Sequence, residues 1–233
     1  MSRMRLDREL VRRCCFPSRS AARNAVIAGF VWVDGAVATR PALGVTADTV
    51  ISVAEETGDY VGRGAHKLAA ALEHFGVVVS GRHAVDVGSS TGGFSQVLLE
   101  AGADSVVALD VGRDQLHPRL RDDPRVEVHE GTNVRDVDVA RLGGPFDVVT
   151  VDLSFISLGI VAPDLERLGG GDADWVVLVK PQFEVGRENL SKDGVVRRAA
   201  ARGMAMGNVI EAFDACGLVT VGAIRSSLPG GSG

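Results

Sequence analysis

Four charged side chains each lie at or near the end of a short apolar run. Asp86 lies in AVDV, Asp110 ends SVVALD, Asp152 ends FDVVTVD and Lys180 ends DWVVLVK. Runs of this length and composition predict buried strands of a parallel sheet. Ligands of open α/β sheets bind at the carboxyl ends of the strands, so we expect one crevice to collect all four side chains.

Asp86 begins a glycine-rich loop with the pattern D-x-G-x-x-x-G-G, and the segment FSQVLLEAG that follows predicts a helix. Asp110 lies 24 residues after Asp86, where the second strand of a doubly wound sheet carries a carboxylate for ribose hydroxyls. The spacing is not G-x-G-x-x-G, which weighs against NAD and FAD. A ligand with a ribose but no phosphates fits better, and S-adenosylmethionine (SAM) is the common one. The candidate cofactor-binding residues are Asp86, Gly88, Ser89, Ser90, Thr91, Gly92, Gly93, Phe94, Asp110, Val111 and, in a polar loop after the third strand, Asn133.

Lys67, Asp152 and Lys180 are the candidate catalytic residues. Methyl transfer from a sulfonium to a sugar hydroxyl needs in-line placement and a group that removes the proton. A lysine with a lowered pKa can be that base, so we expect Lys180 to take the proton and Asp152 to orient its side chain. Lys67 lies in the first turn of a predicted helix, where the helix dipole does not favour a cation, and this misfit indicates a functional role.

Two other methyl acceptors are disfavoured by the residues at the strand ends. Amine methylation predicts a D/N-P-P-aromatic tetrapeptide after the fourth strand, whereas residues 152–155 read DLSF. Carbon methylation of cytosine predicts a nucleophilic cysteine near these ends, and Cys14, Cys15 and Cys216 all lie elsewhere. A ribose 2′-hydroxyl is the acceptor that remains.

The composition is that of an ordinary globular protein, with 45% hydrophobic and 24% charged residues among 233. No segment approaches the ~20 consecutive apolar residues of a membrane helix, and no signal peptide is visible, so we expect a cytoplasmic protein without a membrane partner. Three cysteines without a C-x-x-C pair and five scattered histidines argue against a disulfide framework or a metal site.

The net charge of −5 is unevenly distributed along the chain. Residues 1–30 carry seven arginines against Asp7 and Glu9, a balance of +5, so the remaining residues sum to −10. This asymmetry is typical of an electrostatic docking module joined to a neutral-to-acidic body. The module is expected to contain two short basic helices, LDRELVRR and SRSAARNAVIAG, then a hairpin that turns at Asp34-Gly35, and a strand, TVISVA.

This order of elements, with R-L-D at the front and V-D-G in the hairpin, resembles the S4 RNA-binding domain over roughly residues 3–54. The resemblance implies that the basic helix pair lies against the backbone of structured RNA, which supplies position and affinity rather than sequence readout. The candidate RNA-binding residues are Arg3, Arg5, Arg12, Arg13, Arg19, Arg23 and Arg63.

We expect three parts in the chain: an S4-like domain at 1–56, a linker at 57–63 and a Rossmann-like α/β domain at 64–233. The α/β domain is expected to begin with a helix from near Gly64 to Gly76. Towards its end, RGMAMGNVIEAFDACG predicts a helix and LVTVGAIRSS predicts a strand.

The S4-like module together with RGAHKL, D-x-G-x-S-T-G-G-F, VDLSFISL and VKPQFEVG resembles the TlyA family nearly end to end. The resemblance implies a class I SAM-dependent 2′-O-methyltransferase that acts on cytidines of large-subunit and, in some members, small-subunit ribosomal RNA. It also implies sensitivity to capreomycin-type antibiotics and a Lys-Asp-Lys-Glu tetrad, of which Lys67, Asp152 and Lys180 match the first three. The family continues after P-G-x-S-G into N-x-E-aromatic, so we expect the tetrad glutamate and the last strand to lie beyond Gly233.

Three alternative functions remain open from the sequence. One is a non-catalytic RNA-binding or ribosome-assembly protein that keeps its affinity for SAM, suggested by the missing glutamate. Another is a hemolysin, as members of the family are often labelled, although no strongly amphipathic apolar stretch supports it. The third is a small-molecule methyltransferase, which leaves the basic module unexplained.

Overall fold

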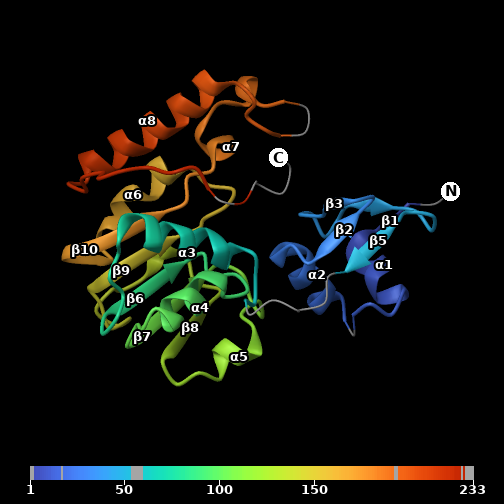
Figure 1. Ribbon diagram of the computed structural model, residues 1–233, viewed down its shortest axis with the longest axis horizontal. Helices are drawn as coiled ribbons and strands as arrows, with labels where there is room; N and C mark the ends of the chain where they lie inside the picture. The colour runs from blue at the N-terminus through green and yellow to red at the C-terminus, as the bar shows by residue number, and fades with distance from the viewer. Residues whose placement is uncertain (1–2, 17, 54–59, 192–193, 227, 229–233) are drawn as a thin grey trace.

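The computed structural model describes residues 3–16, 18–53, 60–191, 194–226 and 228, and it contains a small α+β unit followed by a larger α/β unit (Figure 1). The small unit runs from β1 to β5 and the large unit from α3 to α8. The predicted linker at 57–63 falls partly outside the described residues.

The large unit is built on a five-stranded parallel sheet with the order β10-β9-β6-β7-β8. Its strands are β6 (His83–Val87), β7 (Ser105–Asp110), β8 (Val126–Glu130), β9 (Phe146–Val151) and β10 (Gly169–Val177). From β6 the chain first builds outward through β7 and β8, and then returns to add β9 and β10 on the other side of β6. The order therefore reverses between β6 and β9, where open α/β sheets bind their ligands.

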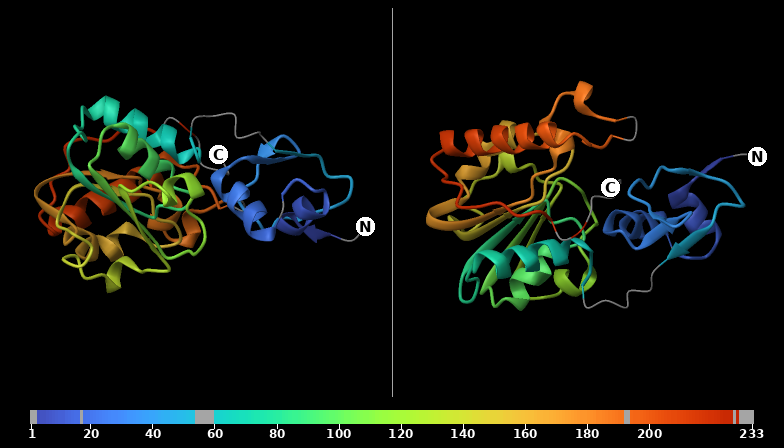
Figure 2. Two further views of the ribbon diagram at one scale, coloured as in Figure 1. Left: turned by 90° about the horizontal axis from the view of Figure 1, so that it is seen from below. Right: turned by 45° about the horizontal axis from the view of Figure 1, so that its top comes forward.

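Helices cover both faces of this sheet (Figures 1 and 2). One face carries α3 (Gly64–Phe75), α4 (Gly93–Glu100) and α5 (Pro118–Arg121), whose leucines pack on β6 and β7. The other face carries α6 (Leu158–Glu166) and α8 (Ala199–Ala215), with the short helices η1 (Val134–Asp136), α7 (Pro181–Glu184) and η2 (Arg187–Asn189) near them. The predicted α/β class is confirmed. Within the described residues, no helix is both long and apolar enough to span a membrane.

The small unit has the predicted order of elements. Helices α1 (Leu6–Arg12) and α2 (Arg19–Ala28) precede a sheet of β2 (Val31–Val33), β3 (Ala36–Val37) and β5 (Ile51–Val53), and a second pair joins β1 (Met4–Arg5) to β4 (Gly44–Val45). The Ser18 hydroxyl accepts a hydrogen bond from the Ala21 N–H at the start of α2, and Gly29 ends that helix with φ of 82°. A serine at the start of a helix and a glycine with positive φ at its end are typical helix-end signals.

Two strand predictions are wrong. The segment LVTVGAIRSS is not a strand: described residues 218–226 have no regular structure and run beside α3, with Val219 81% and Val221 92% exposed. The alternating pattern predicts a strand, but in the described chain β10 pairs only with β9 and this segment pairs with no strand. The fifth strand also begins earlier and ends earlier than expected, so Lys180 lies three residues beyond it, immediately before α7.

Candidate active site

The glycine loop after β6 runs in close contact with the end of β9. A Cβ atom at Gly88 would lie only 2.7 Å from the Asp152 carbonyl oxygen, and its φ of +88° also favours glycine. Gly93 is crowded in the same way, because a Cβ there would lie 3.0 Å from the Ala65 backbone nitrogen. The loop therefore brings the ends of β6 and β9 and the start of α3 together at the point where the strand order reverses.

Asp110 organises this loop from the end of β7. Its carboxylate accepts hydrogen bonds from the Ser90 N–H at 2.9 Å and from the Gly112 N–H at 2.6 Å. The side chain of Val111, next to it, is 67% exposed. Asn133, after β8, accepts a hydrogen bond from the Arg135 N–H at the start of η1. A carboxylate, an exposed apolar side chain and a polar loop thus lie at the carboxyl ends of neighbouring strands.

Asp86 is interior and not exposed at the carboxyl ends of the strands, which corrects the expectation that all four charged side chains gather in one crevice there. It is fully buried, and its two carboxylate oxygens accept hydrogen bonds from Ser95 at 2.7 Å and Thr150 at 3.1 Å. Burial raises the pKa of Asp86 to about 7, although both hydrogen bonds act in the opposite direction. Asp86 precedes the last residue of β6 and lies between α4 and β9, so its hydrogen bonds join these elements.

Phe94 and Ser89 are also enclosed by the protein. Phe94 is 5% exposed and belongs to the core beneath α3, where its ring lies against Gly64. Ser89 is 5% exposed, and its hydroxyl oxygen is buried with no hydrogen-bond partner among the described residues. A buried hydroxyl without a partner is costly, and a bound ligand with a polar atom at this point would satisfy it.

Lys180 and Asp152 form a close ion pair just beyond the ends of β10 and β9. The Lys180 Nζ lies 2.5 Å from Asp152 Oδ1 and donates a hydrogen bond of 2.6 Å to the Ser154 hydroxyl. Both charged side chains are 20% exposed. The amine is therefore held by two oxygens and still reaches solvent, which is the geometry needed to meet a substrate hydroxyl.

Lys67 reaches the same cluster from α3. Burial lowers the pKa of Lys67; the negative charge of Asp152 opposes this effect, while the positive charges of Lys180 and Arg63 add to it. The first residue of α3 also faces the pair, since a Cβ at Gly64 would lie 4.0 Å from Asp152 Oδ2. The structure thus brings together all three residues predicted to be catalytic.

Two further residues near the pair escaped the sequence analysis. Glu184, in α7, accepts hydrogen bonds from the Ser157 hydroxyl at 2.7 Å and from the Leu158 N–H at 3.0 Å, and so caps α6. Phe155 is 90% exposed with φ of +68°, and its ring centroid lies 5.3 Å from that of Phe183. In the sequence, the only signals for these two residues are the segments DLSF and KPQFE that contain them. An exposed phenylalanine with positive φ is unusual, and strained backbone of this kind clusters at functional sites.

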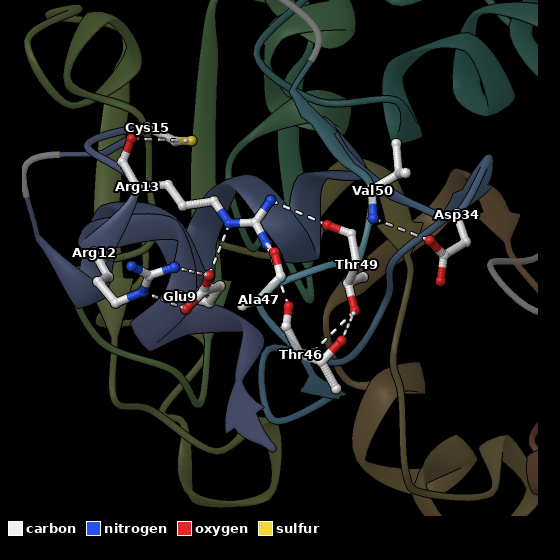
Figure 3. Close-up of polar contacts among 9 residues, drawn as sticks. All are labelled: Glu9, Arg12, Arg13, Cys15, Asp34, Thr46, Ala47, Thr49 and Val50. Carbon is white, nitrogen blue, oxygen red and sulfur yellow. Dashed lines mark hydrogen bonds and ion pairs between the residues drawn. The ribbon is translucent and has the colours of Figure 1, made fainter. Parts of the chain in front are cut away.

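The arginines predicted to bind RNA fall into different environments. Asp7 pairs with Arg5 and Arg19, and Glu9 pairs with Arg12 and Arg13 (Figure 3 shows the Glu9 pairs). The described contacts of Arg3 and Arg23 include no ion pair. Arg63 lies just before α3, and its side chain packs against Gly29 at the end of α2, where a Cβ would lie 2.6 Å from Arg63 Cδ.

Arg13 is the exception among them. Besides Glu9, its guanidinium donates hydrogen bonds to the carbonyls of Thr46, Ala47 and Thr49, at 3.3, 2.9 and 3.0 Å (Figure 3). Its side chain is 24% exposed, against 54% for Arg12. The structure thus gives Arg13 a role in holding the loop between β4 and β5.

Comparison with protein families matches two models to the chain. The FtsJ-like methyltransferase model matches residues 60–233, and the S4 domain model matches residues 4–51. The two matches coincide with the large and the small unit. The resemblance of the first module to an S4 domain is thereby confirmed.

The chain is similar over almost its whole length to proteins of this architecture. It is 47% identical to the 16S/23S rRNA (cytidine-2′-O)-methyltransferase TlyA of Mycobacterium tuberculosis, over 99% of this chain and 87% of that one. It is 36% identical to hemolysin A of Brachyspira hyodysenteriae, over 99% and 96%. The solved structure of a candidate hemolysin from Streptococcus thermophilus superimposes with a TM-score of 0.75, at 34% identity over 100% of this chain and 86% of that one. The chain therefore belongs to the FtsJ-like methyltransferases and, within them, to the TlyA family, which joins this domain to an S4 domain.

Proposed function

We propose that this protein transfers a methyl group from SAM to the 2′-hydroxyl of cytidine in ribosomal RNA of the large subunit, and of the small subunit where that is also a substrate. The observation that carries the proposal is the Lys180–Asp152 pair at the reversal point of the sheet, beside the glycine loop and Lys67. The names of the relatives support the same reaction, and a ribosomal substrate implies action in the cytoplasm.

The residues of the glycine loop fit SAM. The buried Ser89 hydroxyl has no described partner, and the Asp110 carboxylate keeps unused lone pairs beyond its two backbone donors. We assign the contacts with the cofactor to Ser89, Ser90, Asp110, Val111 and Asn133. When bound, SAM supplies an electrophilic methyl group. Asp86 and Phe94, being interior, support the loop rather than touch the cofactor.

Lys180 takes the proton of the ribose hydroxyl in this scheme. Asp152 and Ser154 fix the position of its amine, and Lys67 completes the charge arrangement around Asp152. A positioned base of this kind contributes roughly 10²- to 10⁴-fold to the rate. The nearby Phe155 ring, almost fully exposed and supported by Phe183, offers a surface on which an unstacked RNA base can stack.

The product identifies the reaction. Intact large and small ribosomal subunits are incubated with the protein and methyl-labelled SAM, and the RNA is digested to nucleosides for mass spectrometry. We expect labelled 2′-O-methylcytidine, and label on a base would contradict the proposal. SAM binding by calorimetry without any label in RNA would favour the non-catalytic RNA-binding alternative. Lysis of erythrocytes that persists in a Lys180→Ala variant would favour the hemolysin alternative.

A further inference from the structure

The two acidic residues of the basic helix pair are both buried, although acidic side chains are usually exposed. Asp7 and Glu9 lie in the first turns of α1, and each is 2% exposed. Both are surrounded by arginines, and hydrogen bonds from those arginines, Arg5 first for Asp7 and Arg12 first for Glu9, hold the pKa of each carboxyl at about 2. Two buried negative charges reduce the positive charge of a unit that is proposed to bind RNA, so their presence needs an explanation.

The geometry of these ion pairs supplies one. Arg5 donates through Nε and Nη2 to Asp7, at 3.0 and 2.9 Å, and Arg12 donates through Nε and Nη2 to Glu9, at 2.7 and 2.5 Å. In both cases the carboxylate occupies only the side edge of the planar guanidinium. The contacts among the described residues leave the end edge, formed by Nη1 and Nη2, available for a second two-point contact of the type that arginine makes with phosphate.

The exposed fraction of the side chain distinguishes Arg5, Arg12 and Arg19 from Arg13, which has a structural role. The side chains of Arg5, Arg12 and Arg19 are 47%, 54% and 52% exposed, and Arg19 gives Asp7 a single hydrogen bond of 3.0 Å through Nη2. Arg13 uses its remaining nitrogens on the loop between β4 and β5 instead (Figure 3). Asp7 therefore holds the half-exposed guanidinium groups of Arg5 and Arg19. Glu9 holds the half-exposed group of Arg12 and also Arg13, which anchors the loop between β4 and β5.

We propose that Asp7 and Glu9 are positioning residues of the RNA-binding surface. Asp7 holds the side edge of Arg5 and one nitrogen of Arg19, and Glu9 holds the side edge of Arg12, so that the remaining N–H groups of these three arginines meet RNA phosphates. The inference rests on the proposed function, because it takes ribosomal RNA as the partner of the S4-like unit. Holding a long side chain before binding lowers the entropy that it loses on binding.

The proposal predicts that removing a negative charge from this unit weakens its binding to RNA, whereas net charge alone would predict tighter binding. Glu9→Gln makes the module more positive, yet it should weaken binding of the full-length protein to intact large ribosomal subunits by roughly 3- to 10-fold, the cost of ordering one freed side chain. The matched control is Asp48→Asn, an exposed acid of the same unit, which should leave binding unchanged or slightly tighter. The dependence of affinity on salt should stay that of the parent in Glu9→Gln, because every arginine keeps its charge.

A double-mutant cycle separates positioning from a merely structural role. If Glu9 acts through Arg12, then Glu9→Gln should cause no further loss in an Arg12→Ala background, whereas its effect should add in an Arg23→Ala background. Thermal melting of each variant reports whether the unit is folded. Should Glu9→Gln fail to fold, Arg12→Lys, which keeps the charge but loses the two-point geometry, should itself bind roughly 3-fold more weakly.

Three results would overturn the inference. They are Glu9→Gln binding as tightly as the Asp48→Asn control, the same loss persisting in the Arg12→Ala background, or Arg12→Lys binding like the parent. If the parent chain itself does not bind ribosomal subunits, the RNA-binding part of the proposed function fails and the inference fails with it. That case is recognised at once, because it appears before any variant is compared.

Discussion

At the scale of single residues, Lys180 depends on two oxygens for its position. Asp152 supplies charge and Ser154 supplies a second acceptor at 2.6 Å. If Ser154 is a positioning residue, Ser154→Ala should lower kcat by about 10-fold, the effect of one net hydrogen bond. The affinity for SAM should be unchanged, since Ser154 contacts the base and not the glycine loop. Ser105→Ala, at the opposite end of the sheet, is the control, and an unchanged kcat in Ser154→Ala would show that Asp152 alone positions the amine.

Asp86 gives the protein a distinct dependence of stability on pH. Because burial raises the pKa of Asp86 from 3.8 to about 7, the folded state holds a proton that the unfolded chain has lost, and stability falls as pH rises through this range. The difference amounts to on the order of 4 kcal/mol between pH 4 and pH 8. In the Asp86→Asn variant, stability should therefore fall less between pH 4 and pH 8, by the amount that Asp86 contributes. Urea unfolding of parent and variant at both pH values measures it, and parallel curves would contradict the buried, protonated assignment.

At the scale of elements, a carboxylate at the end of β8 holds much of the loop after β7. Glu130 accepts hydrogen bonds from the backbone N–H groups of Asp114, Gln115 and Leu116, at 2.9, 2.7 and 2.9 Å, and pairs with Arg121 at 2.8 Å. Desolvation opposes ionisation, but these bonds outweigh it and hold the pKa of Glu130 at about 2. The loop begins directly after Asp110, so its shape bears on the cofactor site.

Glu130→Gln should therefore destabilise the protein by about 1–3 kcal/mol and weaken SAM binding. Because the folded pKa of Glu130 is depressed, its contribution is present above about pH 4.5 and is lost as pH falls towards 2. Glu127→Gln, an exposed acid on the same strand, serves as the control for charge. Equal urea midpoints and equal SAM affinities for the two variants at pH 7 would rule out a holding role for Glu130.

The sequence predicted these elements best where local signals and tertiary packing agree. Such signals mark β7, which ends at Asp110, and β9, which ends just before Asp152. They also mark the helix that begins at Gly64 and the hairpin turn at Asp34-Gly35. The predicted strand at LVTVGAIRSS failed because a strand needs a partner, which its own pattern does not supply. The interior position of Asp86 and the contacts of Glu130 depend on neighbours distant in sequence, so residue spacing alone could not show them.

At the scale of the whole molecule, charge is divided between the two units. The first 30 residues carry a balance of +5 and the remainder −10. We therefore expect binding to ribosomal subunits to weaken steeply with salt, with a logarithmic slope of roughly −0.7 to −0.9 per phosphate contact. Arg23→Ala should reduce that slope by about one contact, whereas Arg141→Ala, an exposed arginine of the large unit, should leave it unchanged. Equal slopes for both variants would place the RNA contacts outside the helix pair.

The most direct test of the account is single-turnover methyl transfer by Lys180→Met. Parent, Lys180→Met and the control Arg141→Ala are each loaded with SAM, mixed with intact ribosomal subunits and followed for label in ribose, while calorimetry reports SAM affinity. We predict that Lys180→Met binds SAM within about 2-fold of the parent but transfers methyl roughly 10²- to 10⁴-fold more slowly, and that Arg141→Ala behaves like the parent. Transfer at the parental rate by Lys180→Met would contradict the assignment of the base.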